Sequence, residues 1–594
     1  MQQTMFTHAL IILAFFGALG LCKLYENVAD LPGPQYDFVV VGGGTAGNVV
    51  ANRLTENPEV SVLVLEAGVS NEGVLDSEVP FLLGGLLTST NPYSWNYTTT
   101  PQSGLNDRVL GYLRGHLLGG CSAHNGMVYT RGAADDFNRY ANLTGDKGWS
   151  WDQLFPYFLK NEKWSPPADG HNTQGQFNPA LHGTDGPISV SLTGFPWSVF
   201  EHHAIQTTKE LPDEFPFNLD MNSGQPLGVG WLQSTIGGGE RSMSATGYLA
   251  PEFIQRPNLH VLLHAQVSKL VNVTQQSGKP TFGGVQFLYG TSLFVVKASK
   301  EIIISAGAIG TPQILLNSGI GDHNALEALG IPTVLDLPSV GQNASDHSYF
   351  EMGWSVNSNQ TLESITQNAT RFAEALEQWN MSRTGPFVDS GLTQAAWLRL
   401  AADSPAFDVH ADPSAGPGAP HLELLLSPGG MQGAPGHFVT FTVAMVSPVS
   451  RGSVTLSSSD PFAPPLIDPG LLTSDFDVIA LSEGVKLAQR FVSAPVWRNY
   501  LGAPTVDLAG MSPAELEANL RDNALAGSHI VGTASMSPRG ARYGVVDPDL
   551  KVKGVVGLSV IDASVLPRVP GAHTQAATYV VAERGADLVK QRWA

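Results

Sequence analysis

The stretch "YDFVVVGGGTAGNVVANRLTENPEVSVLVLEAG", from Tyr36 to Gly68, has the pattern of a complete strand–helix–strand unit. Phe38 to Val41 is a continuous apolar run, which is typical of a parallel strand buried on both faces. A glycine-rich turn follows, Asn48 to Leu54 continues as a helix, and Val60 to Leu65 is the second strand. This order predicts a parallel α/β sheet near the start of the protein.

The spacing of glycines in this turn predicts a dinucleotide site. Gly42 allows a tight turn, Gly44 allows a pyrophosphate to approach the backbone, and Gly47 allows the helix to pack closely on the strand. The helix N-terminus supplies free N–H groups and partial positive charge for phosphate. Glu66 ends the second strand, where an acid can accept hydrogen bonds from ribose hydroxyls. This fingerprint fits FAD and NAD(P) about equally well.

The composition excludes several classes of partner. The chain has 594 residues, 43% apolar and 14% charged, which suits a globular protein of more than one domain with a large interior. Its formal net charge of -20 repels nucleic acid and anionic membranes, so we expect neither as a partner. Only two cysteines are present, and no residues have the spacing of a metal site, so we expect no metal.

The N-terminal stretch "HALIILAFFGALGLCK", from His8 to Lys23, is a short apolar run that ends in small residues. It has the pattern of a secretory signal with cleavage near Gly20 to Lys23; a membrane anchor is the alternative interpretation. Seven Asn-X-Ser/Thr sequons follow, at Asn96, Asn142, Asn272, Asn343, Asn359, Asn368 and Asn380. Sequons behind a signal peptide predict a secreted, extracellular glycoprotein.

Three other segments have patterns related to the first unit. "KEIIISAGAIGTPQILLNSGIG", from Lys300 to Gly321, predicts a strand, a glycine turn and a helix. "GLSVIDASVLP", from Gly557 to Pro567, predicts a strand that leads into a turn, and His573 to Gln591 predicts a terminal helix. These separated pieces favour a nucleotide-binding domain assembled from several segments with another domain inserted, although two domains in tandem fit the pattern as well.

A second glycine-rich stretch, "RGHLLGGCSAHNGMVYTRG" from Arg114 to Gly132, places a histidine in a loop that a ligand can approach closely. Together with the first unit, with Ser305 to Gly321, and with "SHIVGTASMSPRG" and "IDASVLPRVPGAHTQ", it resembles the glucose–methanol–choline (GMC) oxidoreductases. These are FAD-dependent flavoproteins that oxidise alcohols. The resemblance covers the chain from Tyr36 to the end, and it favours FAD as the cofactor.

The resemblance implies an α/β FAD-binding domain of the Rossmann-like, glutathione-reductase type. This domain is built from discontinuous segments and accompanies an α+β substrate-binding domain with an antiparallel sheet. The expected boundaries are a signal peptide at 1–22, FAD-binding segments at 36–190, 241–335 and 536–594, and substrate-domain segments at 191–240 and 336–535.

The resemblance also implies which residues carry the chemistry. It places His529 and His573 as the catalytic pair, with His529 as the general base and His573 as the group that positions the substrate oxygen; either imidazole could take the proton. It implies cofactor contacts at Gly42, Gly44, Thr45, Ala46, Gly47, Glu66, Asn125, Gly126, Met127, Val128, Val267, Asp562, Ala563, Thr574 and Gln575. A terminal helix that begins near Thr574 can direct its N-terminal dipole at the cofactor.

Within the family, the chain is similar to the secreted fungal pyranose dehydrogenases and aryl-alcohol oxidases. "SWNYTTTPQ" and "EFPFNLDMNSGQPLGVGW" favour the former, and "SPRGARYGVVDPDLKVKG" is shared by both. In pyranose dehydrogenases the histidine that matches His124 is bonded to the flavin, whereas aryl-alcohol oxidases hold FAD non-covalently and have an aromatic residue where Gly126 stands. We therefore expect FAD bound covalently through His124, a pyranose sugar as donor, and a quinone or another electron acceptor.

Two alternatives stay open at this point. One is an aryl-alcohol oxidase that uses O₂, and the other is a non-catalytic flavin-binding or sugar-binding protein. The chain departs from its relatives at His116, Cys121 and Ile530, and the segment between Leu426 and Val446 is shorter than the corresponding substrate-side loop. These departures leave the identity of the substrate open. We expect the protein to be a monomer.

Overall fold

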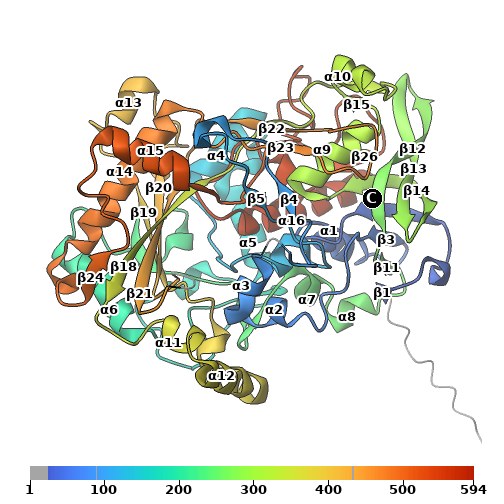
Figure 1. Cartoon of the computed structure of the whole chain (residues 1–594). Helices are drawn as coiled ribbons and strands as arrows, with labels where there is room; N and C mark the ends of the chain where they lie inside the picture. The colour runs from blue at the N-terminus through green and yellow to red at the C-terminus, as the bar shows by residue number, and fades with distance from the viewer. Residues whose placement is uncertain (1–23, 89, 431–433) are drawn as a thin grey trace, which may run out of the picture.

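A computed structural model describes residues 24–88, 90–430 and 434–594. The predicted signal peptide at 1–22 lies outside these residues. The described chain contains two large β-sheets that lie toward opposite sides of the molecule, with helices around and between them (Figure 1).

The larger sheet contains the strand–helix–strand unit quoted above. Its strand order is β1-β11-β3-β2-β14-β13-β12, and β26 also pairs with β14. The bounds are Leu24–Tyr25 (β1), Gln35–Val41 (β2), Val62–Leu65 (β3), Leu259–Leu262 (β11), Gln266–Gln276 (β12), Lys279–Tyr289 (β13), Ser292–Ile304 (β14) and Leu558–Val560 (β26). The neighbouring strands β1, β11, β3, β2 and β14 are all parallel to one another, and β26 is parallel to β14. Strands β12, β13 and β14 form an antiparallel meander.

The parallel strands form the core of this domain because both of their faces are covered. Val39, Val40 and all of β3 are buried. Helix α1 (Gly47–Leu54) packs against the terminal helix α16 (Thr574–Trp593), which in turn packs against α5 (Trp151–Asn161). The second predicted strand begins at Val62 rather than Val60, because the Val60 N–H is bonded to the Asn57 carbonyl in a turn.

The second sheet is antiparallel throughout, in the order β24-β18-β21-β20-β19-β8, with β25 also paired to β18. Its strands are Gly228–Trp231 (β8), Ser348–Val356 (β18), Gln394–Leu398 (β19), Leu422–Ser427 (β20), Phe438–Met445 (β21), Leu501–Pro504 (β24) and Leu525–Ala526 (β25). Helix α14 (Asp475–Val492) covers β20 and β21, and buries Leu481 and Val485 against them.

The two sheets share the chain in alternation. Strands β1 to β3 belong to the larger sheet, β8 to the second, and β11 to β14 to the larger again. Strands β18 to β21, β24 and β25 then belong to the second sheet, and β26 to the larger. This alternation confirms the fold built from discontinuous segments and is incompatible with two domains in tandem.

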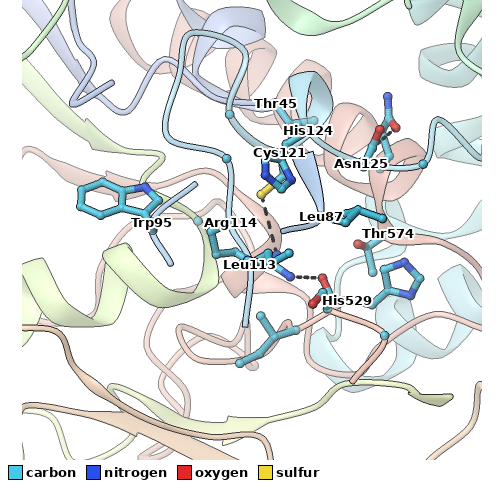
Figure 2. Close-up of a pocket in the computed structure, with 18 of the residues that line it drawn as sticks. Thr45, Leu87, Trp95, Leu113, Arg114, Cys121, His124, Asn125, His529 and Thr574 are labelled. Carbon is cyan, nitrogen blue, oxygen red and sulfur yellow. Dashed lines mark hydrogen bonds between the residues drawn. The ribbon is translucent and has the colours of Figure 1, made fainter. Parts of the chain in front are cut away.

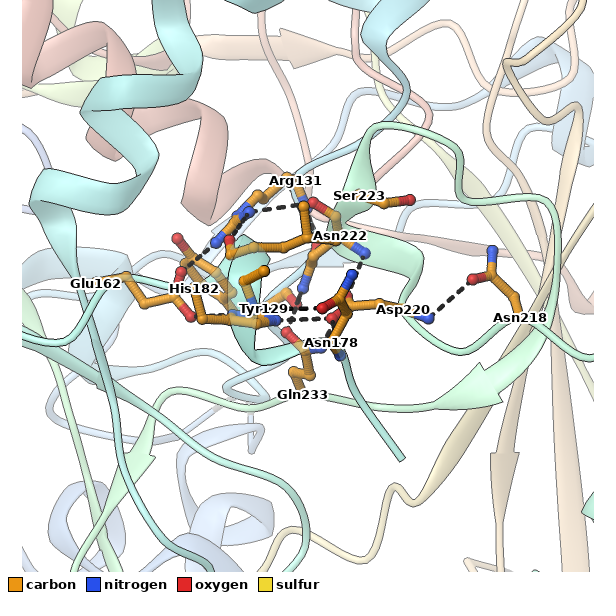
Figure 3. A network of polar contacts seen from close by, with 12 residues as sticks. Tyr129, Arg131, Glu162, Asn178, His182, Asn218, Asp220, Asn222, Ser223 and Gln233 are labelled. Atoms are coloured by element: carbon orange, nitrogen blue, oxygen red, sulfur yellow. Dashed lines mark hydrogen bonds and ion pairs between the residues drawn. The ribbon is translucent and has the colours of Figure 1, made fainter. Parts of the chain in front are cut away.

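A buried polar network lies behind the segment that leaves the second glycine-rich loop (Figure 3). His182 lies between two carboxylates, with Nδ1 2.5 Å from Glu162 Oε1 and Nε2 2.8 Å from Asp220 Oδ2. Glu162 also forms an ion pair with Arg131, and all four side chains are buried. Burial alone would lower the pKa of His182, but the hydrogen bonds to Asp220 and Glu162 raise it above its ordinary value.

This network holds the backbone next to the loop in place. Asn222 accepts a hydrogen bond from the N–H of Arg131 at 2.6 Å and donates to the carbonyl of Tyr129 at 3.0 Å. Between them, the Thr130 hydroxyl accepts the backbone N–H of His573 at 3.0 Å. The buried charges therefore help to position His573 of the predicted catalytic pair. They do so through Asn222 and through the segment Tyr129 to Arg131.

Replacing His182 with leucine should lower the free energy of unfolding by about 3–5 kcal/mol, because removal of one member of a buried ionic group leaves its partners uncompensated. The control is His323→Leu, since the His323 pair with Glu327 is exposed and 3.6 Å long, and such pairs contribute about 0–1 kcal/mol. Urea unfolding followed by tryptophan fluorescence measures both. Equal losses in the two variants would contradict a stabilising role for the network.

Candidate active site

A cavity of about 1160 Å³ is lined by residues of both sheets. It brings together nearly all the residues predicted to bind the cofactor or act in catalysis. The predicted residues that line it are Gly42, Gly44, Thr45, Ala46, Glu66, His124, Asn125, Gly126, Met127, Val128, Val267, His529, Asp562, Ala563, His573, Thr574 and Gln575. Gly47 is the exception.

Gly47 lies behind the turn and has a packing role. A Cβ at this position would lie 1.9 Å from the carbonyl oxygen of Gly42, so only glycine lets α1 start against β2. Gly42 itself has a φ of +100°, which favours glycine. The Glu66 carboxylate accepts the N–H groups of Gly43 and Gly68 at 2.8 and 2.7 Å, and these bonds fix the acid at the end of β3.

Asp562 holds two turns together at the carboxyl ends of β14 and β26. Its carboxylate accepts hydrogen bonds from Gly307 N at 2.9 Å, Thr311 Oγ1 at 2.6 Å and Ser564 N at 2.8 Å. Burial raises the pKa of this carboxyl. The carboxyl ends of neighbouring parallel strands are where α/β sheets bind ligands, and Asp562 shapes this edge by binding protein donors.

Glycines at this edge of the cavity leave the backbone uncovered, and the space beside them fits a dinucleotide. A Cβ built on Gly126 or Gly307 would meet no protein atom within 4 Å, although both residues line the cavity. Gly307 also begins helix α9 (Gly307–Asn317), and α1 begins beside the first glycine turn. Two helix N-termini therefore lie at the same edge of the cavity, and the partial positive charge of a helix N-terminus suits phosphate.

His124 presents an unpartnered nitrogen at the cavity wall. The side chain is 4% exposed, and its Nε2 is buried without a hydrogen-bond partner. Burial, together with the charges of Arg241 and Arg114, lowers the pKa of His124 to about 4, so the ring is neutral. Figure 2 shows His124 on the loop that also carries Cys121, with Arg114 between Cys121 and the segment of His529. A neutral, unpaired imidazole nitrogen in this position suits a bond to a ligand.

Arg241 fixes the loop next to His124. Its guanidinium donates to the Asn125 carbonyl at 2.6 Å, to the Asn125 side-chain oxygen at 3.0 Å and to the Ser77 carbonyl at 2.7 Å. Burial lowers the pKa of Arg241 to about 9. The Asn125 amide in turn donates to the Gln575 side chain, which ties the loop to the first turn of α16.

Two imidazoles meet at the other end of the cavity. The ring centroids of His529 and His573 are 4.6 Å apart. His529 Nδ1 lies 3.0 Å from His347 Nδ1 and 3.4 Å from the Tyr349 hydroxyl. His573 Nε2 lies 3.0 and 3.2 Å from the two oxygens of Glu423. The predicted pair is therefore adjacent, and each member has its own polar partner.

The electrostatics separate the two histidines. Burial, with the neighbouring His573, His347 and Arg114, lowers the pKa of His529 well below its ordinary value, so this ring is neutral and can accept a proton. His573 instead faces the buried acid Glu423, whose carboxylate lies within hydrogen-bond distance of its Nε2.

Four supporting residues were missed in the sequence: Arg241, His347, Tyr349 and Glu423. Glu423 had a usable signal, because it is a single acid within the apolar run "HLELLL", and a buried acid needs a partner. The other three gave none, since only the folded chain brings them to the loop and to His529.

The sequence predicts neither a metal site nor a membrane as a partner. Within the ranges that the structure describes, no cluster of three or more histidine, cysteine or acidic side chains could hold a metal. No helix in those same ranges is long and apolar enough to cross a bilayer. All seven sequon asparagines are exposed.

Comparison with known proteins identifies the family. Two family models, both described as GMC oxidoreductase, match residues 36–349 and 448–582. The chain belongs to the GMC oxidoreductases. It is therefore an FAD oxidoreductase of the group that acts on CH–OH donors, which confirms the predicted family, fold class and enzyme class.

Individual proteins of the family are similar to this GMC oxidoreductase over almost its whole length. It is 44% identical to "Dehydrogenase eriK" of Hericium erinaceus and 41% identical to a pyranose dehydrogenase of Agaricus campestris; each alignment covers 96% of both chains. A solved structure of a fungal aryl-alcohol oxidase is 29% identical, with a TM-score of 0.82 over 94% of this chain and 100% of that one.

Replacing Gly307 with leucine should lower the flavin content of the purified enzyme, because the side chain would project into the cavity edge that fits the cofactor. Gly330→Leu is the matched control. Gly330 has a φ of +70° against +76° for Gly307, and a Cβ at either meets nothing within 4 Å, but Gly330 lies on the surface away from the cavity. Both variants carry the same backbone strain of about 1–2 kcal/mol. The ratio of flavin to protein absorbance measures the result, and equal ratios would place the cofactor elsewhere.

Proposed function

We propose that this GMC oxidoreductase is a secreted dehydrogenase that oxidises a hydroxyl group of a pyranose sugar and passes the electrons to a quinone or another acceptor. The observation that carries this proposal is the polar wall next to the catalytic pair. On the face of the second sheet that lines the cavity, Tyr349 is followed along β18 by Glu351. Thr442 and Thr440 line the cavity from the neighbouring strand β21.

This wall suits a ligand with several hydroxyl groups. Glu351 is directly opposite Thr442, and Thr440 is opposite Ser427 on β20, so the polar side chains form two neighbouring rows. The Thr440 hydroxyl is buried and has no hydrogen-bond partner in the protein. An aromatic ring against this wall would leave these groups unpaired, at a cost of about 1–3 kcal/mol for each buried one. A sugar would satisfy them.

The proposed roles of the chain's own residues follow from the geometry of the pair. FAD bound in the cavity would supply the acceptor for the hydride that leaves the substrate carbon. His529, neutral and half-buried at the cavity wall, accepts the proton of the substrate hydroxyl, and general-base catalysis of this kind contributes about 10²–10⁴-fold. His573 holds the substrate oxygen, while Glu423 fixes the orientation of its ring and Thr130 fixes its backbone.

The N-terminus of α16 supports the other half of the reaction. Thr574 and Gln575 line the cavity in the first turn of this 20-residue helix. The positive end of the helix dipole stabilises negative charge that develops on a bound cofactor. We assign the remaining cavity glycines and Glu66 to the dinucleotide, as predicted from the sequence.

We also propose that FAD is bound covalently through His124. The Nε2 atom of this residue is buried and has no hydrogen-bond partner, which supports the assignment. Gly126 also supports it, because this glycine leaves open space that an aromatic side chain would fill. The resemblance of the loop motif to that of pyranose dehydrogenases supports the same assignment, and a relative with that name is 41% identical.

Denaturation in acid should leave the yellow colour with the precipitated polypeptide of the wild type. In His124→Ala the colour should move to the supernatant or be lost during purification, because the bond is absent. Absorbance of the pellet and supernatant measures the distribution. Free FAD in the wild-type supernatant would disprove the covalent bond without affecting the proposed substrate.

Secretion and glycosylation also remain proposals. The exposure of all seven sequon asparagines supports them, because an oligosaccharide needs access to the side chain. Asn343 is the least suited of the seven, since its side-chain nitrogen donates to Ser535 Oγ and to the Pro567 carbonyl.

An aryl-alcohol oxidase is the second candidate. Phe81 and Trp95 line the cavity, and a solved aryl-alcohol oxidase shares the fold. The non-catalytic alternative is weaker, because His529 and His573 are adjacent, partnered and exposed to the same cavity.

Anaerobic mixing with a panel of sugars and aromatic alcohols separates these functions. Sugars should bleach the flavin absorbance, and benzoquinone should restore it faster than O₂. The His529→Ala variant should keep its flavin but be reduced about 10²–10⁴-fold more slowly. Bleaching by aromatic alcohols alone would favour the oxidase, and bleaching by neither class would favour a non-catalytic protein.

A further inference from the structure

Glu351 differs from the other charged side chains at the cavity wall, because it has no partner in the part of the chain that the structure describes. It lies on β18, lines the cavity and forms neither a hydrogen bond nor an ion pair with a described residue. The other charged side chains that line the cavity all bind protein atoms: Glu66, Arg114, Glu363 and Asp562. The carboxylate of Glu351 is therefore available to a donor on a ligand.

No positive charge of the described protein compensates this carboxylate. Desolvation by the surrounding wall raises the pKa of Glu351, and no cationic side chain opposes that shift. Among the described residues that line the cavity, Arg114 is the only arginine or lysine, and it donates to the Ser528 carbonyl. The desolvated carboxylate thus lacks donors that a ligand with hydroxyl or ammonium groups would supply.

The position of Glu351 along β18 relates it to the catalytic pair. Tyr349 is two residues earlier on the same strand, lines the same cavity, and has its hydroxyl 3.4 Å from Nδ1 of His529. Residues two apart on a strand are separated by about 7 Å, which is comparable to the width of one pyranose ring with its hydroxyl groups. A sugar whose reacting hydroxyl lies at His529 therefore brings its opposite end toward Glu351.

Hydroxyl groups on the next strand accompany Glu351. Thr442 on β21 is directly opposite Glu351, and Thr440 is two residues earlier on that strand. Thr440 lines the cavity and is only 6% exposed, yet its hydroxyl has no hydrogen-bond partner in the protein. An ionised carboxylate only accepts hydrogen bonds, whereas a hydroxyl can donate or accept. This combination matches a ligand with neighbouring hydroxyl groups and does not match an anion.

We propose that Glu351 is a specificity-determining residue whose carboxylate accepts hydrogen bonds from hydroxyl or ammonium groups at the end of the substrate remote from the oxidised carbon. The enzyme then selects neutral and amino sugars and rejects sugar acids. A carboxylate on the substrate at this place brings a second negative charge to Glu351 and no donor, and such like-charge contacts exclude a wrong ligand. The inference deepens the proposed sugar specificity and rests on it.

Two substitutions in the holoenzyme test this role. Glu351→Gln removes the negative charge and keeps the shape of the side chain. Glu363→Gln is the matched control, because Glu363 lines the same cavity but its carboxylate already accepts the Gly430 N–H at 3.0 Å. Anaerobic flavin reduction at neutral pH is measured with glucose or galactose, whichever bleaches the wild type, and with the corresponding uronate and amino sugar.

In the wild type, the second-order rate constant for flavin reduction should be about tenfold or more higher for the neutral sugar than for its uronate. The amino sugar should react about as well as the neutral sugar. Glu351→Gln should lower the ratio of neutral sugar to uronate about tenfold, chiefly because the uronate reacts faster. The limiting rate with the neutral sugar should change little, since Glu351 is remote from the reacting carbon, and Glu363→Gln should keep the wild-type ratio.

A wild type that the uronate reduces as fast as the neutral sugar would overturn the proposal, even if neither variant folds. An unchanged ratio in Glu351→Gln, or an equal fall in both variants, would overturn it as well. If only aromatic alcohols bleach the flavin, the proposed sugar substrate is wrong, and the same ratio between para-methoxybenzyl alcohol and para-(hydroxymethyl)benzoate decides the role of Glu351. If neither class bleaches it, calorimetric affinities for the same pairs decide.

Discussion

One buried carboxylate, Asp346, joins the parts of the molecule that meet at the catalytic pair. It accepts backbone N–H groups from two segments more than 180 residues apart, those of His347 and His529. Its second oxygen accepts the Tyr112 hydroxyl, next to the loop that carries Arg114. Burial raises the pKa of Asp346, and the nearby Arg114 charge opposes that shift. The position of His529 thus depends on a charge that no substrate contacts.

Other charged side chains around the cavity also bind groups of the protein itself. Glu66 binds two glycine N–H groups, Asp562 binds donors from two turns, Glu423 holds His573, and Arg241 holds Asn125. Each of these charged side chains has hydrogen-bond partners in the protein, and these bonds offset part of the free-energy cost of burying it. The cavity itself is lined by apolar side chains together with backbone, imidazole and hydroxyl groups.

The sequence was most informative where the chemistry depends on local geometry. The glycine turn, the adjacent strand and helix, and the start of α16 at Thr574 all follow from spacing within a few residues, and the structure agrees with them. Gly47 was predicted to allow close packing, and that is the role its position supports. The pairing of His529 with His573 came from the family resemblance, because two histidines among 16 carry no signal of their own.

What could not be predicted depends on contacts between distant segments. The antiparallel meander on β14 gave no clear alternation of apolar and polar residues, because its outer part is exposed on both faces. His347 and Arg241 act through residues more than 100 positions away, and their neighbours along the chain say nothing of those partners. Only Glu423 could have been suspected from its apolar surroundings.

The alternation of the chain between its two sheets has a consequence for biosynthesis. During synthesis, β2, β3 and β14 leave the ribosome long before β26 and α16. More than 250 residues separate the end of β14 at Ile304 from the start of β26 at Leu558. Until that part has emerged, the parallel sheet lacks one edge, Asp562 cannot bind Gly307, and α16 does not yet cover α1. The second sheet likewise cannot pair β8 before β19 exists. The cofactor site is therefore complete only once the segment from β26 to α16 has been synthesised, and the complete site cannot bind FAD before then.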